Sequence, residues 1–198
     1  MLDIIIRLEE EKDYRIVEEM TRAAFSYPGR IERGGIGCPF EHWMVHALRK
    51  QDGIIELSYI AEVNDIIVGH VIYSNARVET TDGKTVHVLN LGPLSVHPEY
   101  QKLGVGKALM NATIAKATEL GYGAILFFGR PEYYPQFGFV ESKTYGITDC
   151  GGGNYPAFMA MELKKGYLRN VCGRFYESPI YDDSLNHFSV IEYDKTFR

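Results

Sequence analysis

Hydrophobic and polar residues follow two different periods along this chain. Between Asp13 and Phe25, apolar residues recur every three to four positions, which is the spacing of one helix face. Residues 55–63 and 66–76 are instead rich in branched apolar residues, and Asn64-Asp65 between them is typical of a tight hairpin. The pattern therefore predicts helices and strands in the same chain.

Turn-forming residues set the other boundaries. Residues 27–40 are rich in glycine and proline, which predicts a loop, and residues 81–84 predict a turn. The expected strands are residues 2–8, 55–63, 66–76, 85–96, 124–128, 137–140 and 157–163, and the expected helices are residues 13–25, 40–51 and 103–120. The strand, helix and strand between residues 85 and 128 predict a right-handed βαβ unit, because residues 124–128 are continuously apolar, as in a buried parallel strand.

Gly92-Pro93 interrupts the strand expected at residues 85–96. Proline has no amide to donate within a ladder, so the pair favours a bulge over a regular strand. Two shorter strands joined by a bend are the alternative.

Composition limits the classes of protein that this chain can represent. Its 198 residues favour one domain, and 45% hydrophobic with 24% charged residues is typical of a soluble globular protein. A net charge of −5 argues against a nucleic-acid partner. No apolar run is long enough to cross a membrane, and three widely spaced cysteines suggest neither a disulfide framework nor a zinc site. We expect a cytoplasmic protein without a membrane partner and without a metal.

We assign residues 1–165 to a single domain. Residues 166–198, the C-terminal extension, are rich in aromatic residues and too apolar for a disordered tail. We expect the extension to pack on the domain or on a partner subunit, which leaves a homodimer open.

The most informative segment follows the strand at residues 85–96. Gln101-Lys102-Leu103-Gly104-Val105-Gly106-Lys107, which we call the cradle, places two glycines at the start of a helix. The first amides of a helix lack partners and lie at the positive end of its dipole, so they bind anions. Glycine lets a phosphate approach the backbone, which predicts a pyrophosphate site.

The spacing Gln-x-x-Gly-x-Gly differs from the dinucleotide fingerprint and from the P-loop. It resembles motif A of the GNAT superfamily of acyl-CoA-dependent N-acetyltransferases. A second segment, Pro131 to Phe139, resembles the GNAT element in which a tyrosine, here Tyr134, precedes a Gly-Phe pair by four residues. Together with Gly92-Pro93-Leu94, these segments are similar to a group of predicted acetyltransferases.

The resemblance implies an α/β fold of GNAT type. Its central mixed, mostly antiparallel sheet would have about six to seven strands, a splayed parallel pair formed by strands 4 and 5, and flanking helices. Acetyl-CoA would be the co-substrate, with its pantetheine arm along the backbone of strand 4 and its pyrophosphate in the cradle. The implied coenzyme-binding residues are Leu94, Ser95, Val96, Gln101, Lys102, Leu103, Gly104, Val105, Gly106 and Lys107.

Acyl transfer to an amine needs a neutral amine and a proton for the departing sulfur. An alkylammonium of pKa about 10.4 costs roughly 4.6 kcal/mol to deprotonate at pH 7. Tyr134 is the expected acid, with Tyr133 as the alternative, because a tyrosine hydroxyl can protonate a thiolate. The base is open among Asn90, Glu132 and His87, because residues 126–128 carry no carboxylate where some GNAT enzymes have a glutamate.

We therefore expect an N-acetyltransferase that moves the acetyl group of acetyl-CoA directly to a primary amine. The alternative on the same fold is a non-catalytic acyl-CoA-binding sensor or interaction module. His42 and His46 have the spacing of a metal-binding pair on a helix, but Trp43 stands where a metalloprotease helix has glutamate, so this alternative is disfavoured.

Overall fold

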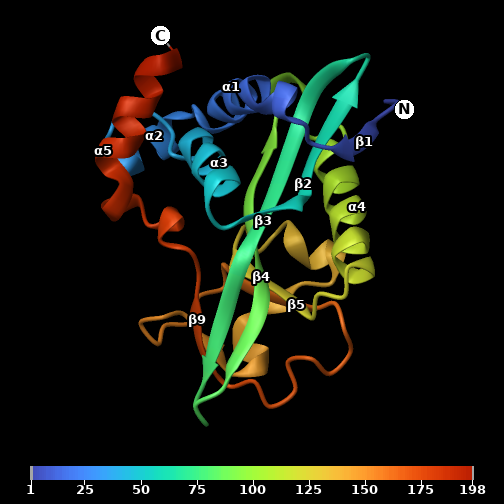
Figure 1. Cartoon of the computed structure of the whole chain (residues 1–198), viewed down its shortest axis with the longest axis vertical. Coiled ribbons are helices and arrows are strands. Elements are labelled where there is room, and N and C mark those ends of the chain that lie inside the picture. Colours follow the sequence, from blue (N-terminus) through green and yellow to red (C-terminus); the bar gives the residue numbers. More distant parts are fainter. Residues whose placement is uncertain (1, 198) are drawn as a thin grey trace.

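The computed structural model describes residues 2–197, apart from the side chains of residues 33 and 34, and these residues form one nine-stranded sheet (Figure 1). The strands are β1 (Ile5–Leu8), β2 (Gly53–Val63), β3 (Ile66–Thr80), β4 (Thr85–Val96), β5 (Ala124–Phe128), β6 (Val140–Glu141), β7 (Ile147–Thr148), β8 (Phe158–Glu162) and β9 (Gly173–Tyr176). Their order is β1-β2-β3-β4-β5-β8-β6, and β9 pairs with β3 and β7. Because β4–β5 and β7–β9 are parallel and the other pairs antiparallel, the expected mixed α/β sheet is confirmed, with more strands than predicted.

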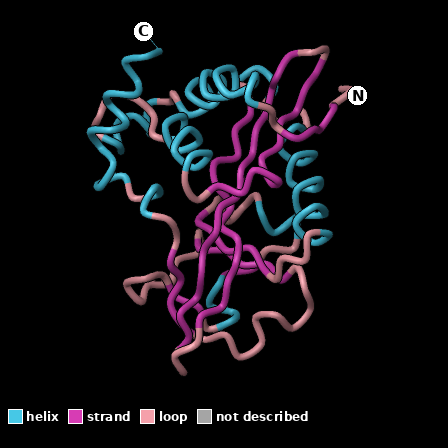
Figure 2. The backbone as a smooth tube through the Cα atoms, in the orientation of Figure 1, coloured by secondary structure: helices cyan, strands magenta, loops and turns pink. Residues whose placement is uncertain are grey.

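Helices cover both faces of the sheet (Figure 2). The α-helices are α1 (Tyr14–Phe25), α2 (Pro28–Gly34), α3 (Glu41–Lys50), α4 (Val105–Glu119) and α5 (Asp183–Asp194). The side chains of Val105 and Leu109 pack α4 into a core on one face. On the other face, α1, α3 and α5 share a second core that includes Val17, Val45 and Val190. Among the described residues, no helix is both long and apolar enough to span a bilayer.

The hairpin between β2 and β3 is as predicted. Asn64 and Asp65 have φ angles of 50° and 64°, and a two-residue turn with both angles positive matches the twist of its flanking strands. Both residue types tolerate this conformation because their short polar side chains bond locally.

A bulge in β4 at Gly92-Pro93 is also confirmed. Tyr73 of β3 pairs with Leu91, whereas Val71 pairs with Leu94, so two residues of β4 lie opposite one residue of β3. The bulge bends β4 at the point where the proline has no amide to contribute to the ladder.

The loop predicted at residues 27–40 is wrong in part, because it contains α2. Pro28 occupies the first turn of this helix, where a missing amide costs nothing, and Gly35 ends it with a φ of 65°. A helix this short has too few turns to show a hydrophobic period.

The strand predicted at residues 137–140 is also wrong for most of its length. Residues Tyr134–Phe137 form a short 3₁₀ helix that ends at Gly138, with a φ of 98°, and only Val140 belongs to a strand, β6. Glycine accommodates the left-handed conformation that turns the chain back toward β8.

The sequence did not predict α5 in the C-terminal extension, and it did not predict β9 there either. This strand within the C-terminal extension pairs antiparallel with the end of β3, from Arg77–Tyr176 to Thr80–Gly173. β3 is correspondingly longer than expected and continues to Thr80. Four residues with two buried positions carry too little alternation to be identified as a strand from the sequence.

Candidate active site

The cradle begins α4 in the way the glycine spacing predicts. Gly104 is the N-cap of the helix and has a φ of 97°, which glycine adopts without strain. Among the described residues, none accepts a hydrogen bond from the backbone amides of Val105, Gly106 and Lys107. Three amides and the positive end of a 15-residue helix therefore point at one place, an arrangement that suits an anion.

The two glycines of the cradle have different roles. A Cβ on Gly104 would meet no atom within 4 Å, so its φ angle alone requires glycine. A Cβ on Gly106 would lie 2.9 Å from the hydroxyl oxygen of Tyr133, so there the space is already taken.

Some side chains of the cradle contact the rest of the protein, and others are exposed to solvent. Gln101 donates from Nε2 to the carbonyl oxygen of Val96, over 3.2 Å, and ties the loop to the end of β4. Val105 is buried in the core, so only its amide faces the cradle. Lys102 and Lys107 are exposed, and both cations are available to a bound polyanion.

Strands β4 and β5 separate next to the cradle. They pair only at Leu89–Ile125 and Asn90–Leu126. Beyond these pairs, no described β5 residue pairs with residues 91–96, and we call this opening the slot. Within it, Leu94 and Val96 are partly buried, while the buried hydroxyl of Ser95 accepts from Thr21 of α1 over 2.9 Å. The backbone of Leu94–Val96 is therefore the part of these residues that a ligand in the slot would meet.

Tyr134 lies against β5 on the face that α4 covers. Its ring centroid is 4.5 Å from that of Phe127, and it packs on the same core as Val105 and Leu109 of α4. Burial raises the pKa of Tyr134 well above its ordinary value, so the hydroxyl stays protonated at neutral pH. Among the described residues, none forms a hydrogen bond with this hydroxyl.

Tyr133 lies in different surroundings from its neighbour. The ring centroids of Tyr133 and Tyr134 are 5.1 Å apart and their planes are 84° apart. The Tyr133 hydroxyl approaches the backbone of Gly106, which places it at the first turn of α4. Tyr133 is therefore near the predicted anion site, whereas Tyr134 lies beside β5.

Asn90 has a partner that the sequence did not reveal. Its Nδ2 donates to Oε2 of Glu177 over 2.7 Å, and the two residues come from β4 and from the chain just after β9. Burial raises the pKa of Glu177 to about 7, although the hydrogen bond from Asn90 acts to lower it and the charge of Asp182 adds to the rise. A single glutamate in an aromatic-rich extension carries no motif that could have identified it.

Tyr181 lies beside this pair. Its hydroxyl shares a hydrogen bond of 2.9 Å with Oγ of Ser74, the β3 residue paired with Asn90. A Cβ on Gly92 would lie 2.8 Å from the same hydroxyl, so Tyr181 touches the β4 bulge. The C-terminal extension thus brings both Glu177 and Tyr181 to the end of the slot.

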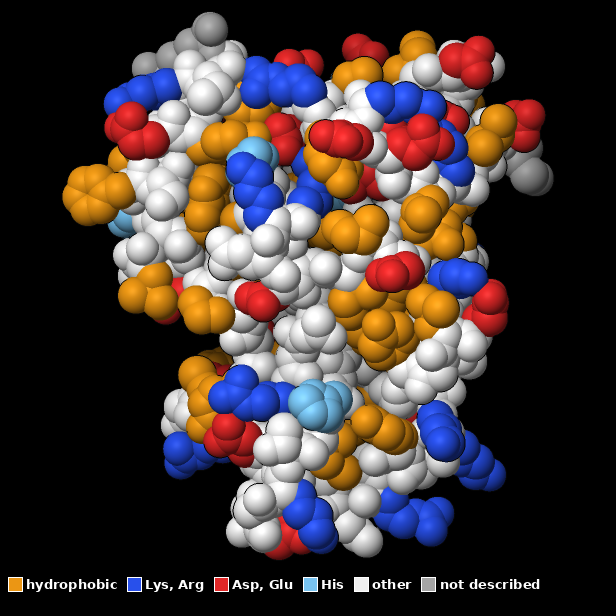
Figure 3. All heavy atoms as spheres, in the orientation of Figure 1, with side chains coloured by type: hydrophobic (Ala, Val, Ile, Leu, Met, Phe, Trp, Pro, Cys, Tyr) orange, Lys and Arg blue, Asp and Glu red, His pale blue; other side chains and the backbone are white. Residues whose placement is uncertain are grey.

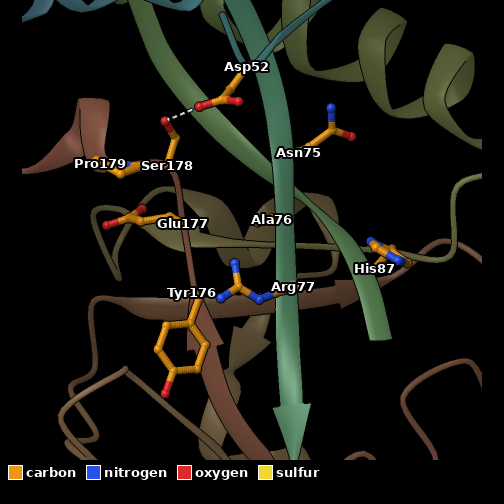
Figure 4. A pocket seen from close by; sticks show the side chains of 9 residues that line it. All are labelled: Asp52, Asn75, Ala76, Arg77, His87, Tyr176, Glu177, Ser178 and Pro179. Atoms are coloured by element: carbon orange, nitrogen blue, oxygen red, sulfur yellow. Dashed lines mark hydrogen bonds between the residues drawn. The ribbon is translucent and has the colours of Figure 1, made fainter. Parts of the chain in front are cut away.

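Glu177 also borders a cavity of about 300 Å³ at the edge of β3, between the start of β2 and the end of β9 (Figure 4). Figure 4 shows Asp52, Arg77 and His87 around the same space. The hydroxyl of Ser178 donates to Oδ2 of Asp52 over 2.5 Å. Figure 3 shows a hollow in the molecular surface on the side where β9 lies. The hollow separates the upper half, which contains most helices, from the lower half, which contains mainly strands. The carboxylate therefore lies between the protein interior and a route to solvent.

The other candidate bases are less well placed. Glu132 is exposed on the turn after β5. His87 is also exposed, at the rim of the cavity, and its carbonyl oxygen accepts from the hydroxyl of Tyr167.

The two histidines of α3 have protein partners. His42 Nε2 lies 3.3 Å from Asp194 and His46 Nδ1 lies 3.1 Å from Glu18. Within residues 2–197, no group of three or more histidine, cysteine or acidic side chains is arranged to hold a metal ion.

The family of the chain follows from comparison with known proteins. The model of the acetyltransferase (GNAT) family matches residues 15–139, which is more than half of the chain. The chain therefore belongs to the GNAT acetyltransferase family. It is similar to the uncharacterized N-acetyltransferase YjhQ of Escherichia coli K12, with 34% identity over 102 residues. This alignment spans 51% of the chain and 51% of YjhQ, so the match covers about half of that relative.

Solved structures share the whole architecture. The GNAT family N-acetyltransferase YhbS from Escherichia coli, in complex with CoA, has a TM-score of 0.76 at 22% identity, covering 96% of this chain and 93% of YhbS. A GNAT acetyltransferase from Brucella melitensis, in complex with acetyl-CoA, has a TM-score of 0.67 at 23% identity, covering 92% and 100%. At this level of identity, the two structures establish a common fold.

Proposed function

We propose that this protein is an acetyl-CoA-dependent N-acetyltransferase that transfers an acetyl group directly to a primary amine. The observation that best supports this function is that the cradle lies next to the slot between β4 and β5. The cradle offers unpaired amides at Val105–Lys107. Membership in the GNAT family and the CoA and acetyl-CoA complexes of structural neighbours support the same ligand.

The residues present suit such a ligand. The amides of the cradle and the side chains of Lys102 and Lys107 would bind the diphosphate. The free edge of β4 at Leu94–Val96 would hydrogen-bond the amide groups of the pantetheine arm, as one strand does with another. The thioester would then lie at the end of the slot, near Asn90 and Phe127.

In this proposal, Tyr134 donates the proton that the departing sulfur needs. Its hydroxyl is protonated at neutral pH and has no described protein partner. It lies on the α4 face of β5, the side on which the coenzyme would lie in this proposal. Tyr133 would instead contact the diphosphate, because its hydroxyl approaches Gly106.

Release of free thiol from acetyl-CoA, measured across a panel of amines, tests the function. We expect thiol release with at least one primary amine, and competition by desulfo-coenzyme A but not by ATP or NAD. Tight coenzyme binding without thiol release from any amine would overturn the proposal in favour of the non-catalytic sensor. A cytoplasmic location and a homodimer stay predictions.

A further inference from the structure

The C-terminal extension supplies a carboxylate to the end of the slot. Glu177 lies outside the residues that the family model matches, yet its side chain reaches Asn90 of β4. Asn90 is the last β4 residue with a partner in β5, and the strands separate directly after it. The carboxylate is therefore one residue away from the opening in which the proposed thioester would lie.

Glu177 and Tyr134 occupy opposite faces of the sheet. Leu89 and Leu91 face the α4 core, and successive side chains of a strand alternate, so Asn90 between them faces the other side. Tyr134 packs against the α4 core. The opening between β4 and β5 thus has a hydroxyl donor on one side and a carboxylate on the other.

The surroundings of Glu177 allow proton exchange with solvent. The residue borders the cavity at the edge of β3, which opens to the surface. The titratable and charged groups around it are Asp52 before β2, Arg77 of β3, His87 of β4, Tyr176 of β9, and Tyr181 and Asp182 of the extension. Oε2 accepts from Asn90, and no described cation forms an ion pair with Glu177.

We propose that Glu177 is the general base of the transfer and that Asn90 is the residue that positions it. This inference rests on the proposed acetyltransferase function. The amine acceptor would approach from the face that α1 and α3 cover, opposite the coenzyme, as an alkylammonium ion attracted by the carboxylate. A base of pKa about 7 is matched to neutral pH, where it is partly ionised and still able to take a proton.

The ammonium loses one proton to Glu177, which releases it through the cavity to solvent. The nitrogen then forms a bond to the carbonyl carbon, the carbon–sulfur bond breaks, and the second nitrogen proton leaves by the same carboxylate. The sulfur receives one proton through Tyr134, whose hydroxyl regains one from solvent. One proton is released for each acetylated ammonium.

The pH dependence of kcat/KM for thiol release tests this role. The wild-type protein should show an acidic limb near pH 7, because the carboxylate must be ionised to accept a proton. Glu177→Gln should lower kcat/KM by about 100-fold or more and remove that limb, while coenzyme affinity changes less than threefold. Glu192→Gln, an exposed glutamate paired with Lys195 in the same extension, is the matched control and should behave as wild type.

A second variant tests the role without removing the carboxylate. The Asn90 hydrogen bond lowers the pKa of Glu177, so Asn90→Ala should move the acidic limb to higher pH. An aromatic amine acceptor whose own pKa lies well below the assay pH is already neutral before it attacks and has only one nitrogen proton to lose during transfer, so Glu177→Gln should lose far less activity with it.

The outcomes separate this inference from the function on which it depends. If wild type releases thiol but Glu177→Gln keeps the limb and the rate, Glu177 is not the base and the acetyltransferase proposal stands. If Glu177→Gln and Asn90→Ala both lower the rate equally at every pH and the acidic limb does not move, Glu177 and Asn90 have a structural role. That result would also overturn the inference. If wild type binds coenzyme and never releases thiol, both proposals fall.

Discussion

Tyr133 and Tyr134 are adjacent in the chain but lie against different parts of the proposed site. The turn that precedes them places one ring over the first turn of α4 and the other against Phe127 of β5. The two rings also pack edge to face, with their centroids 5.1 Å apart, and replacement of either tyrosine by phenylalanine removes a hydroxyl but keeps this contact. The pair therefore offers an internal comparison between proton donation and coenzyme binding.

We expect Tyr134→Phe to lower kcat tenfold or more and to change coenzyme affinity only a few-fold, because only the proton donor is lost. Tyr133→Phe should have the opposite profile, with weaker coenzyme binding and a nearly unchanged kcat. Thiol release and equilibrium coenzyme binding measure the two quantities. Equal kcat for wild type and Tyr134→Phe would remove Tyr134 from the mechanism.

At the scale of elements, the start of α4 depends on both glycines for separate reasons. Gly104→Ala forces a side chain into a left-handed conformation and should cost about 1 kcal/mol of folding stability. Gly106→Ala should displace Tyr133 and weaken coenzyme binding, with little change in helix geometry. Thermal unfolding and coenzyme titration of the two variants provide the comparison. The prediction fails if Gly106→Ala binds coenzyme as tightly as wild type.

Long elements with their own periodicity were predictable from the sequence. α1, α3, α4 and the strands β2 to β4 each carry enough residues to show a helical or strand pattern, and local turn residues mark their ends. β5 was predicted from its continuous apolar run. β9 and α2 were not predicted because each is short. α5 was not predicted either, although it has 12 residues. β9 forms only because the end of β3 extends past β2 and offers it a free edge.

At the scale of the molecule, a buried charge cluster joins the N-terminal and C-terminal parts. Arg49 of α3 is almost fully buried and forms ion pairs with Glu9, which follows β1, and with Glu18 of α1. Tyr193 of α5 donates to Glu18 over 2.6 Å. One guanidinium therefore bridges two buried carboxylates, and the C-terminal helix is attached to the same cluster.

Loss of this cation should destabilise the fold. Arg49→Leu leaves Glu9 and Glu18 buried without it, which should lower the free energy of unfolding by about 3–5 kcal/mol. Lys195→Leu, which breaks an exposed pair with Glu192, should cost no more than about 1 kcal/mol. Urea denaturation at neutral pH compares the two variants. Similar small losses in both would contradict the prediction.

The same cluster should make the stability of the fold fall at acidic pH. Burial acts to raise the pKa of Glu9, but His70 and Arg49 outweigh it and lower that pKa from 4.5 to about 2. A carboxylate whose pKa falls on folding adds stability above pH 4.5, and this contribution is lost as the pH falls toward 2. The unfolding free energy of wild type should therefore drop more between pH 6 and pH 3 than that of Glu9→Gln. Parallel pH profiles would show that Glu9 does not contribute.

The sequence by itself determined the glycine-capped start of α4, the β4 bulge and the family resemblance. These features are local, because glycine spacing and a proline act on the backbone within a few residues. Only the tertiary structure decided that Glu177 meets Asn90 across 87 positions of the chain. The contact depends on β9 pairing with β3, and the pKa of that carboxylate depends on how much water the fold removes from around it.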